Sequence, residues 1–355
     1  LLKNLIMSKI KRSKRILVSG TLPPPLGGAT VSFNFLAKAA EANKHHDCDI
    51  FDFKSNTNVM MQFIDLFKLM FYCLKYDVIS IHANPKRIAL WGLFLVPFSK
   101  LLNKKLQFRF FGSDLDLFVL ENSLNKLLVS IINHADSVLL QTKGLIDFWS
   151  NTFPEKSKIS WFPTSRPINK KYEFLKREIK TLKLIYVGHL KEEKGIKLLI
   201  SVFNELKSDY DISLTLIGCC VDQEILELIE SSKGIIYKGE MSPKEIPIIL
   251  ENHHVFVFPT FWKGEGYPGA MIEAMQAGLP IISSNWRYLN ELVINDFNGY
   301  LVEVNDKKSL TTAINQFIND KNKVNDFGNN SVDFTRKFDS KYWNEKKFFE
   351  LLPIK

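Results

Sequence analysis

The stretch that decides the fold reads Phe258-Pro-Thr-Phe-Trp-Lys-Gly-Glu265-Gly-Tyr-Pro-Gly-Ala-Met-Ile-Glu273-Ala-Met-Gln-Ala-Gly278. Residues 255–259 have the pattern of a buried strand, 264–269 that of a glycine-rich turn, and 270–277 that of a helix ended by a glycine and a proline. On one helix, the two glutamates would point about 80° apart, at about 100° per residue. We therefore expect Glu265 in a loop and Glu273 inside the helix.

The first turn of this predicted helix lies between the two carboxylates. Its free N–H groups and the helix dipole form a site that favours phosphate. The spacing suits a nucleoside diphosphate sugar, with Glu273 accepting hydrogen bonds from ribose hydroxyls and Glu265 orienting the sugar. A strand, a turn and a helix carrying two solvated glutamates would explain the same residues, and from this stretch alone both interpretations stay open.

Length and composition bound the class of protein. A chain of 355 residues is long enough for two domains, because single cores rarely exceed about 250–300 residues. Its 46% hydrophobic and 24% charged residues are typical of a soluble globular protein. The longest apolar run, residues 88–98, is too short for the roughly 20 residues of a spanning helix. The basic leader 1–15 lacks a signal-peptide core, so we expect a cytoplasmic protein.

Cysteine and histidine show no metal-ligand spacing. The four cysteines include the adjacent pair Cys219 and Cys220, which is poorly placed to bridge itself. The histidine pairs His45-His46 and His253-His254 would point to opposite faces of a strand. We expect a reducing compartment and no metal.

Positive charge concentrates in the first half of the chain. Residues 1–170 carry 23 Lys and Arg against 12 Asp and Glu, a net +11, whereas residues 171–355 carry 24 against 26, a net −2. An anionic lipid surface, an anionic substrate, or a basic leader with ordinary surface charge would each explain this bias. No nucleic-acid-binding signature is present, so no nucleic-acid partner is expected.

Strand-like and helix-like runs alternate along most of the chain, which is typical of parallel sheets with helical crossovers. The predicted strands are 15–19, 49–53, 77–82, 106–110, 137–141, 159–162, 184–187, 213–217, 235–238, 255–259, 280–283 and 300–302. The predicted helices include 29–43, 60–75, 86–102, 123–134, 143–151, 307–319 and 342–352. A charged stretch, 169–183, interrupts the rhythm as a linker. Two doubly wound sheets result, and ligands would bind between them at the strand carboxyl ends.

Three further segments at strand ends carry candidate site residues. The paired glycines Gly27-Gly28 precede a helix, which favours an anion and permits close backbone approach, although they match neither a dinucleotide nor a P-loop fingerprint. Lys194 lies where another helix begins and could neutralise a diphosphate. Arg109 and Asp114 lie near the end of a third strand. A structural turn, a surface lysine and a helix cap are the alternatives.

These residues together resemble the retaining GT-B glycosyltransferases of family 4. Glu265 and Glu273 match the family's E-x7-E signature, with Pro259 before it and Glu-Ala-Met-x-Ala-Gly-x-Pro-Ile from Glu273 onward. Residues 187–195 are similar to its G-R-x-x-x-x-K-G element, Gly27-Gly28 to its N-terminal glycine loop, and residues 285–302 to its downstream segment.

The resemblance implies a GT-B fold, in which two Rossmann-like domains face each other across a cleft. The N-terminal acceptor-side domain would span 1–168 and the nucleotide-sugar-binding domain 169–338, with 339–355 crossing back as a helix. Glu265, Lys194 and Asp114 would be the catalytic residues. Donor binding would involve Glu273, Gly28, His189, Arg109 and the backbone of Gly266, Tyr267, Pro268, Gly269 and Ala270.

Two positions depart from the family pattern. His189 stands where the family usually has a phosphate-binding arginine, so the charge there depends on pH. Phe111 stands where relatives often carry histidine or arginine, so a polar contact to the sugar would be missing or supplied by Arg109.

The function implied is transfer of a sugar from UDP-sugar or GDP-sugar, with retention and without metal or cofactor, to a saccharide or lipid-linked saccharide in cell-surface polysaccharide or glycolipid synthesis. A sugar-nucleotide epimerase, a phosphorylase and a non-catalytic nucleotide-sugar-binding subunit are the alternatives. The apolar segments 60–76 and 88–102, interspersed with Lys68, Lys75, Lys86, Arg87 and Lys100, suggest peripheral contact with the cytoplasmic face of a membrane. Core helices of a doubly wound sheet would look nearly the same.

Overall fold

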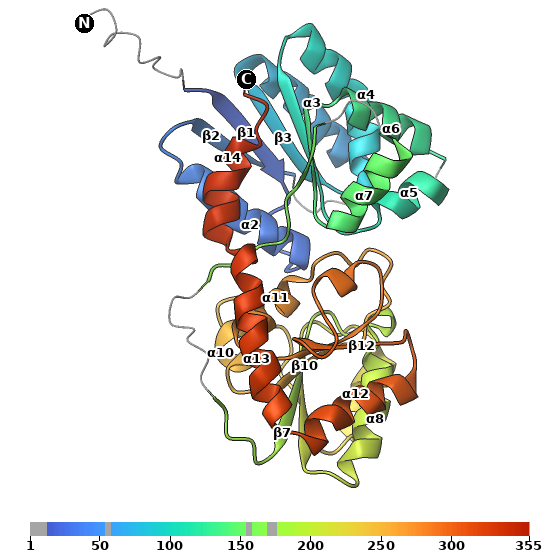
Figure 1. The fold of residues 1–355 in the computed structure, drawn as a ribbon. Helices are drawn as coiled ribbons and strands as arrows, with labels where there is room; N and C mark the ends of the chain where they lie inside the picture. The colour runs from blue at the N-terminus through green and yellow to red at the C-terminus, as the bar shows by residue number, and fades with distance from the viewer. Residues whose placement is uncertain (1–12, 54–57, 122, 154–157, 169–175, 355) are drawn as a thin grey trace, which may run out of the picture.

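The computed structural model of the chain describes residues 13–53, 58–121, 123–153, 158–168 and 176–354. It contains two parallel sheets, each covered by helices and stacked along the long axis of the molecule (Figure 1). The leader 1–12 and residues 169–175 of the expected linker lie outside the described residues. Within the described ranges, no helix is both long and apolar enough to span a bilayer.

The N-terminal sheet has six parallel strands in the order β2-β1-β3-β4-β5-β6. The strands are β1 (Arg15–Gly20), β2 (Asp47–Asp52), β3 (Val78–Ala83), β4 (Lys105–Phe110), β5 (Ser137–Leu140) and β6 (Ile159–Trp161). The crossover helices are α2 (Gly28–Glu41), α3 (Val59–Lys75), α4 (Pro85–Leu101), α5 (Leu115–Glu121), α6 (Asn125–His134) and α7 (Lys143–Thr152). The strand order changes direction between β1 and β3, so the loop that leads into α2 lies at a switch point.

The C-terminal sheet has the order β12-β11-β10-β7-β8-β9, which is the 3-2-1-4-5-6 Rossmann order read from the opposite edge. Its strands are β7 (Leu182–Val187), β8 (Ile212–Ile217), β9 (Ile235–Tyr237), β10 (Val255–Phe258), β11 (Ile281–Ser284) and β12 (Gly299–Val302). Its helices are α8 (Ile196–Lys207), α9 (Gln223–Ser231), α10 (Ile246–Leu250), α11 (Gly269–Gln276), α12 (Lys307–Asn319) and α13 (Asn322–Thr335). The switch point falls between β7 and β10, the strands that precede Lys194 and Glu265.

These two sheets confirm the predicted fold class and the predicted strands, with ends that shift by one or two residues. The strands form because β-branched and aromatic residues such as Ile185, Val257 and Phe258 are completely or almost completely buried between two helical layers. Helix α13 was not predicted. Its sequence is rich in asparagine and contains Gly328, residues of low helix propensity, so packing against α11 and α12 stabilises it.

The C-terminal segment packs on the N-terminal sheet, beside α2, as the red ribbon in Figure 1 shows. It contains a π-helical turn, η4 (Lys341–Lys347), followed by α14 (Phe348–Glu350), where one regular helix was predicted. Trp343, Phe348 and Leu352 share a buried cluster with residues of β1 and α2. The Leu351 carbonyl accepts a hydrogen bond of 2.9 Å from Gln107 Nε2 on β4.

Trp343 supplies the largest apolar contact of this segment, because its ring packs edge-on against Trp161 and Phe162 with centroids 5.0 and 5.7 Å away. Trp343→Ala is expected to lower the free energy of unfolding by about 3–5 kcal/mol. The neighbouring Tyr342, 44% exposed, provides the control Tyr342→Ala. Equal urea midpoints for the two variants would contradict this packing role.

Candidate functional site

Glu265 and Lys194 form a buried ion pair at the switch point of the C-terminal sheet. The Lys194 Nζ to Glu265 Oε2 distance is 2.5 Å, and their side chains are 14% and 6% exposed. Thr260 donates a second hydrogen bond of 2.9 Å to the same carboxylate oxygen. Glu265 lies in the loop after β10 and Lys194 ends the 3₁₀ turn η1 (Glu192–Lys194) that leads into α8, as the sequence predicted.

The loop geometry explains how this pair is held. Gly195 has φ +73°, and a Cβ there would lie 2.1 Å from the carbonyl oxygen of Pro259, so only glycine fits between η1 and the end of β10. Lys194 Nζ also lies 4.2 Å from the centre of the Trp262 ring, a favourable cation–π distance. The lysine is therefore fixed over the glycine-rich turn that carries Glu265.

Glu273 lies on α11, one turn inside the helix, and pairs with Arg166 from the segment that links the two domains. Arg166 Nε donates to Glu273 Oε1 at 2.5 Å, and Arg166 Nη1 donates to Ser32 Oγ on α2 at 3.1 Å. Burial raises the pKa of the Glu273 carboxyl, and the charge of Arg166 acts in the opposite direction. Arg166 was not among the predicted site residues.

The start of α11 has features that favour an anion. Pro268 precedes the helix and gives its first turn no side-chain cap, so the first N–H groups are not used by a capping residue. A Cβ on Gly269 would lie 1.6 Å from Arg166 Nη2, so the guanidinium rests directly against this helix start. Helix α2 also begins without a side-chain cap, and it contacts α11 at the junction of the domains (Figure 1). Positive charge and two helix N-termini therefore converge here.

The residues Gly266 to Ala270, predicted to contact the diphosphate through their backbone, differ in their surroundings. Pro268 has no N–H to donate. Gly266 lies close to the N-terminal domain, since a Cβ there would lie 1.9 Å from Gln141 Oε1. The side chain of Tyr267 is buried and donates its hydroxyl to Glu291. Gly269 and Ala270 lie in the first turn of α11, where their N–H groups would face an anion.

His189 and Gly28 lie where the site is most open. His189 is exposed, and its ring contacts the backbone of Leu26 in the glycine loop of the other domain. Burial lowers the pKa of His189, and the charges of Lys191 and Lys194 lower it further, so the imidazole is neutral at pH 7. A Cβ on Gly28 would meet nothing within 4 Å, and neither Gly27 nor Gly28 uses the positive φ that glycine permits.

Arg109 lies near the end of the N-terminal strand β4 and Asp114 follows that strand, and the two side chains have different surroundings. The Arg109 guanidinium is buried between Phe111 and Phe162, with its Cζ 4.7 and 4.4 Å from the two ring centres. Burial and the nearby Arg166 lower the pKa of Arg109 to about 9. This side chain is 2% exposed and is therefore covered. Asp114 is half-buried at the start of α5, and burial raises the pKa of its carboxyl.

The two domains meet through tight polar contacts around these residues. A Cβ on Gly112 would lie 2.8 Å from the carbonyl oxygen of Gly264, so the two glycine turns touch. Arg287 pairs with Asp116, and Tyr288 donates to the same carboxylate at 2.8 Å. The Glu291 carboxylate accepts from the N–H groups of Lys143 and Gly144 at 2.9 and 2.8 Å, which places an anion at the start of α7.

Arg166 and Arg287 are the residues that reasoning from sequence missed. Arg166 is an isolated arginine after Pro163-Thr-Ser in the linker region, and Arg287 follows Asn285-Trp in the downstream segment. Only the fold shows that each arginine reaches a carboxylate on a distant element.

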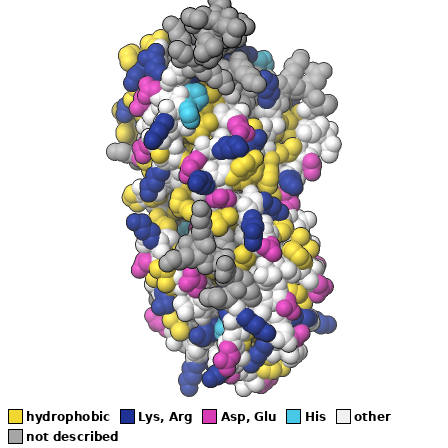
Figure 2. All heavy atoms as spheres, turned by 60° about the vertical axis from the view of Figure 1, so that its left-hand side comes forward, with side chains coloured by type: hydrophobic (Ala, Val, Ile, Leu, Met, Phe, Trp, Pro, Cys, Tyr) yellow, Lys and Arg dark blue, Asp and Glu magenta, His cyan; other side chains and the backbone are white. Residues whose placement is uncertain are grey.

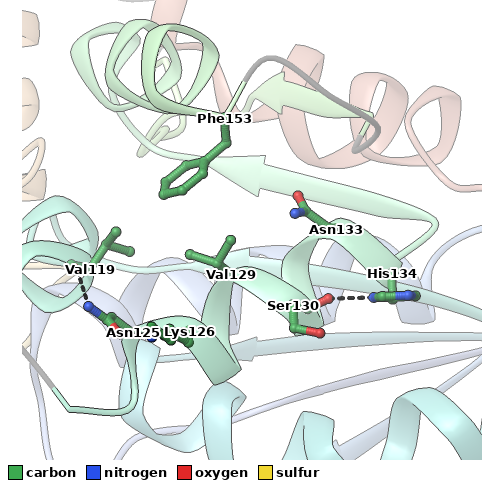
Figure 3. Close-up of a pocket in the computed structure, with 8 residues that line it drawn as sticks. All are labelled: Val119, Asn125, Lys126, Val129, Ser130, Asn133, His134 and Phe153. Atoms are coloured by element: carbon green, nitrogen blue, oxygen red, sulfur yellow. Dashed lines mark hydrogen bonds between the residues drawn. The ribbon is translucent and has the colours of Figure 1, made fainter.

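A separate pocket of about 430 Å³ lies on the N-terminal domain between α5, α6 and the end of α7 (Figure 3). Its lining residues are Val119, Asn125, Lys126, Val129, Ser130, Asn133, His134 and Phe153. None of them is a predicted site residue. In Figure 3 the His134 ring turns back to the Ser130 carbonyl of its own helix, at 2.7 Å.

Comparison with known proteins agrees with this architecture. Residues 168–333 match the family model of the glycosyl transferases group 1. A capsular polysaccharide biosynthesis glycosyltransferase of Staphylococcus aureus is 31% identical over 152 residues, which cover 41% of this chain and 39% of that protein. A UDP-Gal:alpha-D-GlcNAc-diphosphoundecaprenol alpha-1,3-galactosyltransferase of Escherichia coli is 46% identical over 77 residues, or 22% of this chain and 19% of that protein. The matched regions span less than half the length of these two relatives.

Solved structures share the whole fold. Anabaena HepE in complex with UDP and glucose superposes with a TM-score of 0.73 at 17% identity, covering 95% of this chain and 98% of that one. Sucrose-phosphate synthase of Thermosynechococcus elongatus gives 0.75 at 16% identity, with the same coverage. Residues 168–333 thus match the glycosyl transferases group 1 family, and the chain as a whole has the GT-B fold.

Substitutions of Lys194 and Glu265 are expected to have coupled effects on the free energy of unfolding. Lys194→Met leaves a buried carboxylate without its partner and should lower the free energy of unfolding by about 3–5 kcal/mol. Lys194→Met with Glu265→Gln should recover a large part of that loss, as measured by urea denaturation. Lys197→Met, which removes a lysine from an exposed pair with Glu192 and Glu224, is the control and should change little. Strictly additive effects of the two substitutions would contradict the coupling.

Proposed function

We propose that this chain is a retaining glycosyltransferase that moves a sugar from a nucleoside diphosphate sugar to a saccharide or lipid-linked saccharide. The observation that carries the proposal is the position of two ion pairs, Lys194 with Glu265 and Arg166 with Glu273, on either side of the uncapped start of α11. Relatives named for capsule and diphosphoundecaprenol-linked synthesis support a role in cell-surface polysaccharide or glycolipid assembly. The proposal places this step at the cytoplasmic face of the membrane.

In this proposal the donor lies across the start of α11. Glu273 accepts hydrogen bonds from the ribose, the N–H groups of Gly269 and Ala270 hold a phosphate, and Glu265 orients the sugar. Lys194 and Arg166 supply the positive charge. Arg166 would partly replace the phosphate-binding arginine that the family usually has at the position of His189. UDP-sugars are the first donors to test, because HepE was solved with UDP and UDP-glucose.

The chemistry follows from charge and positioning. The sugar leaves with its electrons on the β-phosphate oxygen, and cations fixed before the reaction stabilise that developing charge. Lys194 is already held by Glu265 and by the Trp262 ring, so little reorganisation is needed. The departing phosphate oxygen can accept the acceptor's proton, so no side chain need act as a nucleophile. Orientation of donor and acceptor between the domains supplies the remaining acceleration.

Glu273→Gln is expected to weaken UDP-sugar binding by about tenfold or more, because an amide is a poorer acceptor for ribose hydroxyls than a carboxylate. Isothermal titration calorimetry measures the effect. Glu230→Gln, an exposed carboxylate on α9, is the matched control. Unchanged affinity in Glu273→Gln would remove the ribose assignment. Binding without release of nucleoside diphosphate in any acceptor screen would favour a non-catalytic subunit.

Titration of His189 is expected to make the affinity for UDP depend on pH. Its lowered pKa makes the imidazole neutral above about pH 6.5, so it adds positive charge beside the diphosphate only as the pH falls below that value. UDP affinity relative to the His189→Gln variant should therefore rise between pH 8 and pH 5.5, since titration of UDP itself is common to both proteins. His189→Arg should bind UDP about tenfold more tightly at pH 8. A constant ratio between wild type and His189→Gln would place His189 away from the phosphate.

A further inference from the structure

Helices α3 and α4 expose a continuous apolar surface that the sheet does not cover. On α3 the exposed apolar side chains recur at the spacing of one helix face and lie within about 100° of each other. The exposed apolar residues are Met60, Phe63, Ile64, Phe67, Phe71 and Leu74 on α3, and Leu90, Leu93, Phe94 and Leu101 on α4. The two helices pack beside each other, so these residues form one surface, which we call the α3–α4 face.

The α3–α4 face is distinct from the side of each helix that packs in the core. Leu66, Leu69 and Cys73 of α3 are buried, as are Trp91 and Leu95 of α4. Both helices thus have a conventional core side and a second apolar side in solvent. Phe67 and Phe71 are 68% and 72% exposed. Contiguous exposed apolar residues are rare on monomeric proteins and mark interaction surfaces. Apolar residues on the 17-residue helix α3 extend along about 25 Å.

The charges on this face have one sign. Its exposed charged residues are Lys68, Lys75, Lys86 and Lys100. The one acidic residue of the two helices, Asp65, is 8% exposed and lies on the core side, where its charge acts on Arg87. Elsewhere the surface is different, since acidic and basic side chains are intermixed on the view in Figure 2. Lys75 also lies 3.6 Å from the half-exposed Asp49 carboxylate of β2. An apolar stripe whose own exposed charges are all lysines is the pattern of a helix that lies in an anionic lipid interface.

We propose that the α3–α4 face binds the surface of an anionic lipid bilayer, with the phenylalanines in the acyl boundary and the lysines at the lipid phosphates. A second copy of the chain fits less well, because two such faces would bring the lysines of both copies together and these like charges would repel. The inference rests on the proposed function in one respect. It places the acceptor-side domain against the membrane, where a lipid-linked saccharide would present its sugar to the cleft.

Co-sedimentation with vesicles tests the proposal directly. Wild type should pellet with vesicles containing phosphatidylglycerol at low salt, and about tenfold less with pure phosphatidylcholine. Phe67→Ser with Phe71→Ser should lower binding to the anionic vesicles about tenfold or more. Lys68→Gln with Lys75→Gln should weaken binding and flatten its salt dependence. Ile236→Ser with Ile248→Ser removes apolar residues that are 51% and 62% exposed on the C-terminal domain, and it should leave binding unchanged.

The outcomes separate this inference from the proposed function. Each variant should keep the wild-type melting temperature and UDP-sugar affinity, because the α3–α4 face includes none of the donor-site residues. Wild type that stays in the supernatant with anionic vesicles would overturn the proposal even if donor binding is intact. A dimer in light scattering that the phenylalanine variant dissociates, without vesicle binding, would also overturn it and make the face a self-association surface.

Discussion

Arg166 is the residue on which the arrangement of the two domains depends. Its backbone pairs with the returning chain, through Arg166 N–H to Phe338 O and Ser340 N–H to Arg166 O, each at 3.0 Å. Its side chain pairs with Glu273 on α11 and with Ser32 on α2. Both crossings between the domains and both uncapped helix starts therefore meet at one buried guanidinium. Removing a partner from such a buried pair costs far more than an exposed pair contributes, so position 166 tolerates little change.

The same contact sets the chemistry of the site. Burial disfavours the ionised form of Glu273 and raises the pKa of its carboxyl, and Arg166 offsets part of that effect from its place beside the start of α11. Lys194 and Glu265 repeat that arrangement on the other side of the glycine-rich turn. A nucleoside diphosphate sugar carries its hydroxyls and phosphates in the order that these two pairs would recognise. Substrate binding would exchange contacts within each pair for contacts with the ligand.

Much of the fold was predictable because parallel strands buried on both faces appear in the sequence as short continuous apolar runs, separated by helix-like segments. The loop position of Glu265 and the helical position of Glu273 followed from helix geometry, and the switch point between β7 and β10 then brought Lys194 to Glu265. The partners Arg166 and Arg287 were not predictable, because each acts across more than 100 residues of sequence. For Arg109 the position was predictable but the burial was not. It occupies the expected strand end, yet its guanidinium is packed between aromatic rings. An apolar run locates a residue along a strand, whereas the exposure of its side chain depends on what covers the sheet.

A crystal structure of the protein with a UDP-sugar bound would show where the donor lies. We expect ribose hydroxyls within hydrogen-bond distance of Glu273, a phosphate at the N–H groups of Gly269 and Ala270 beside Lys194, and the sugar against Glu265. A nucleotide bound elsewhere, or bound in the cleft without contacting Glu273 and Lys194, would contradict this expectation.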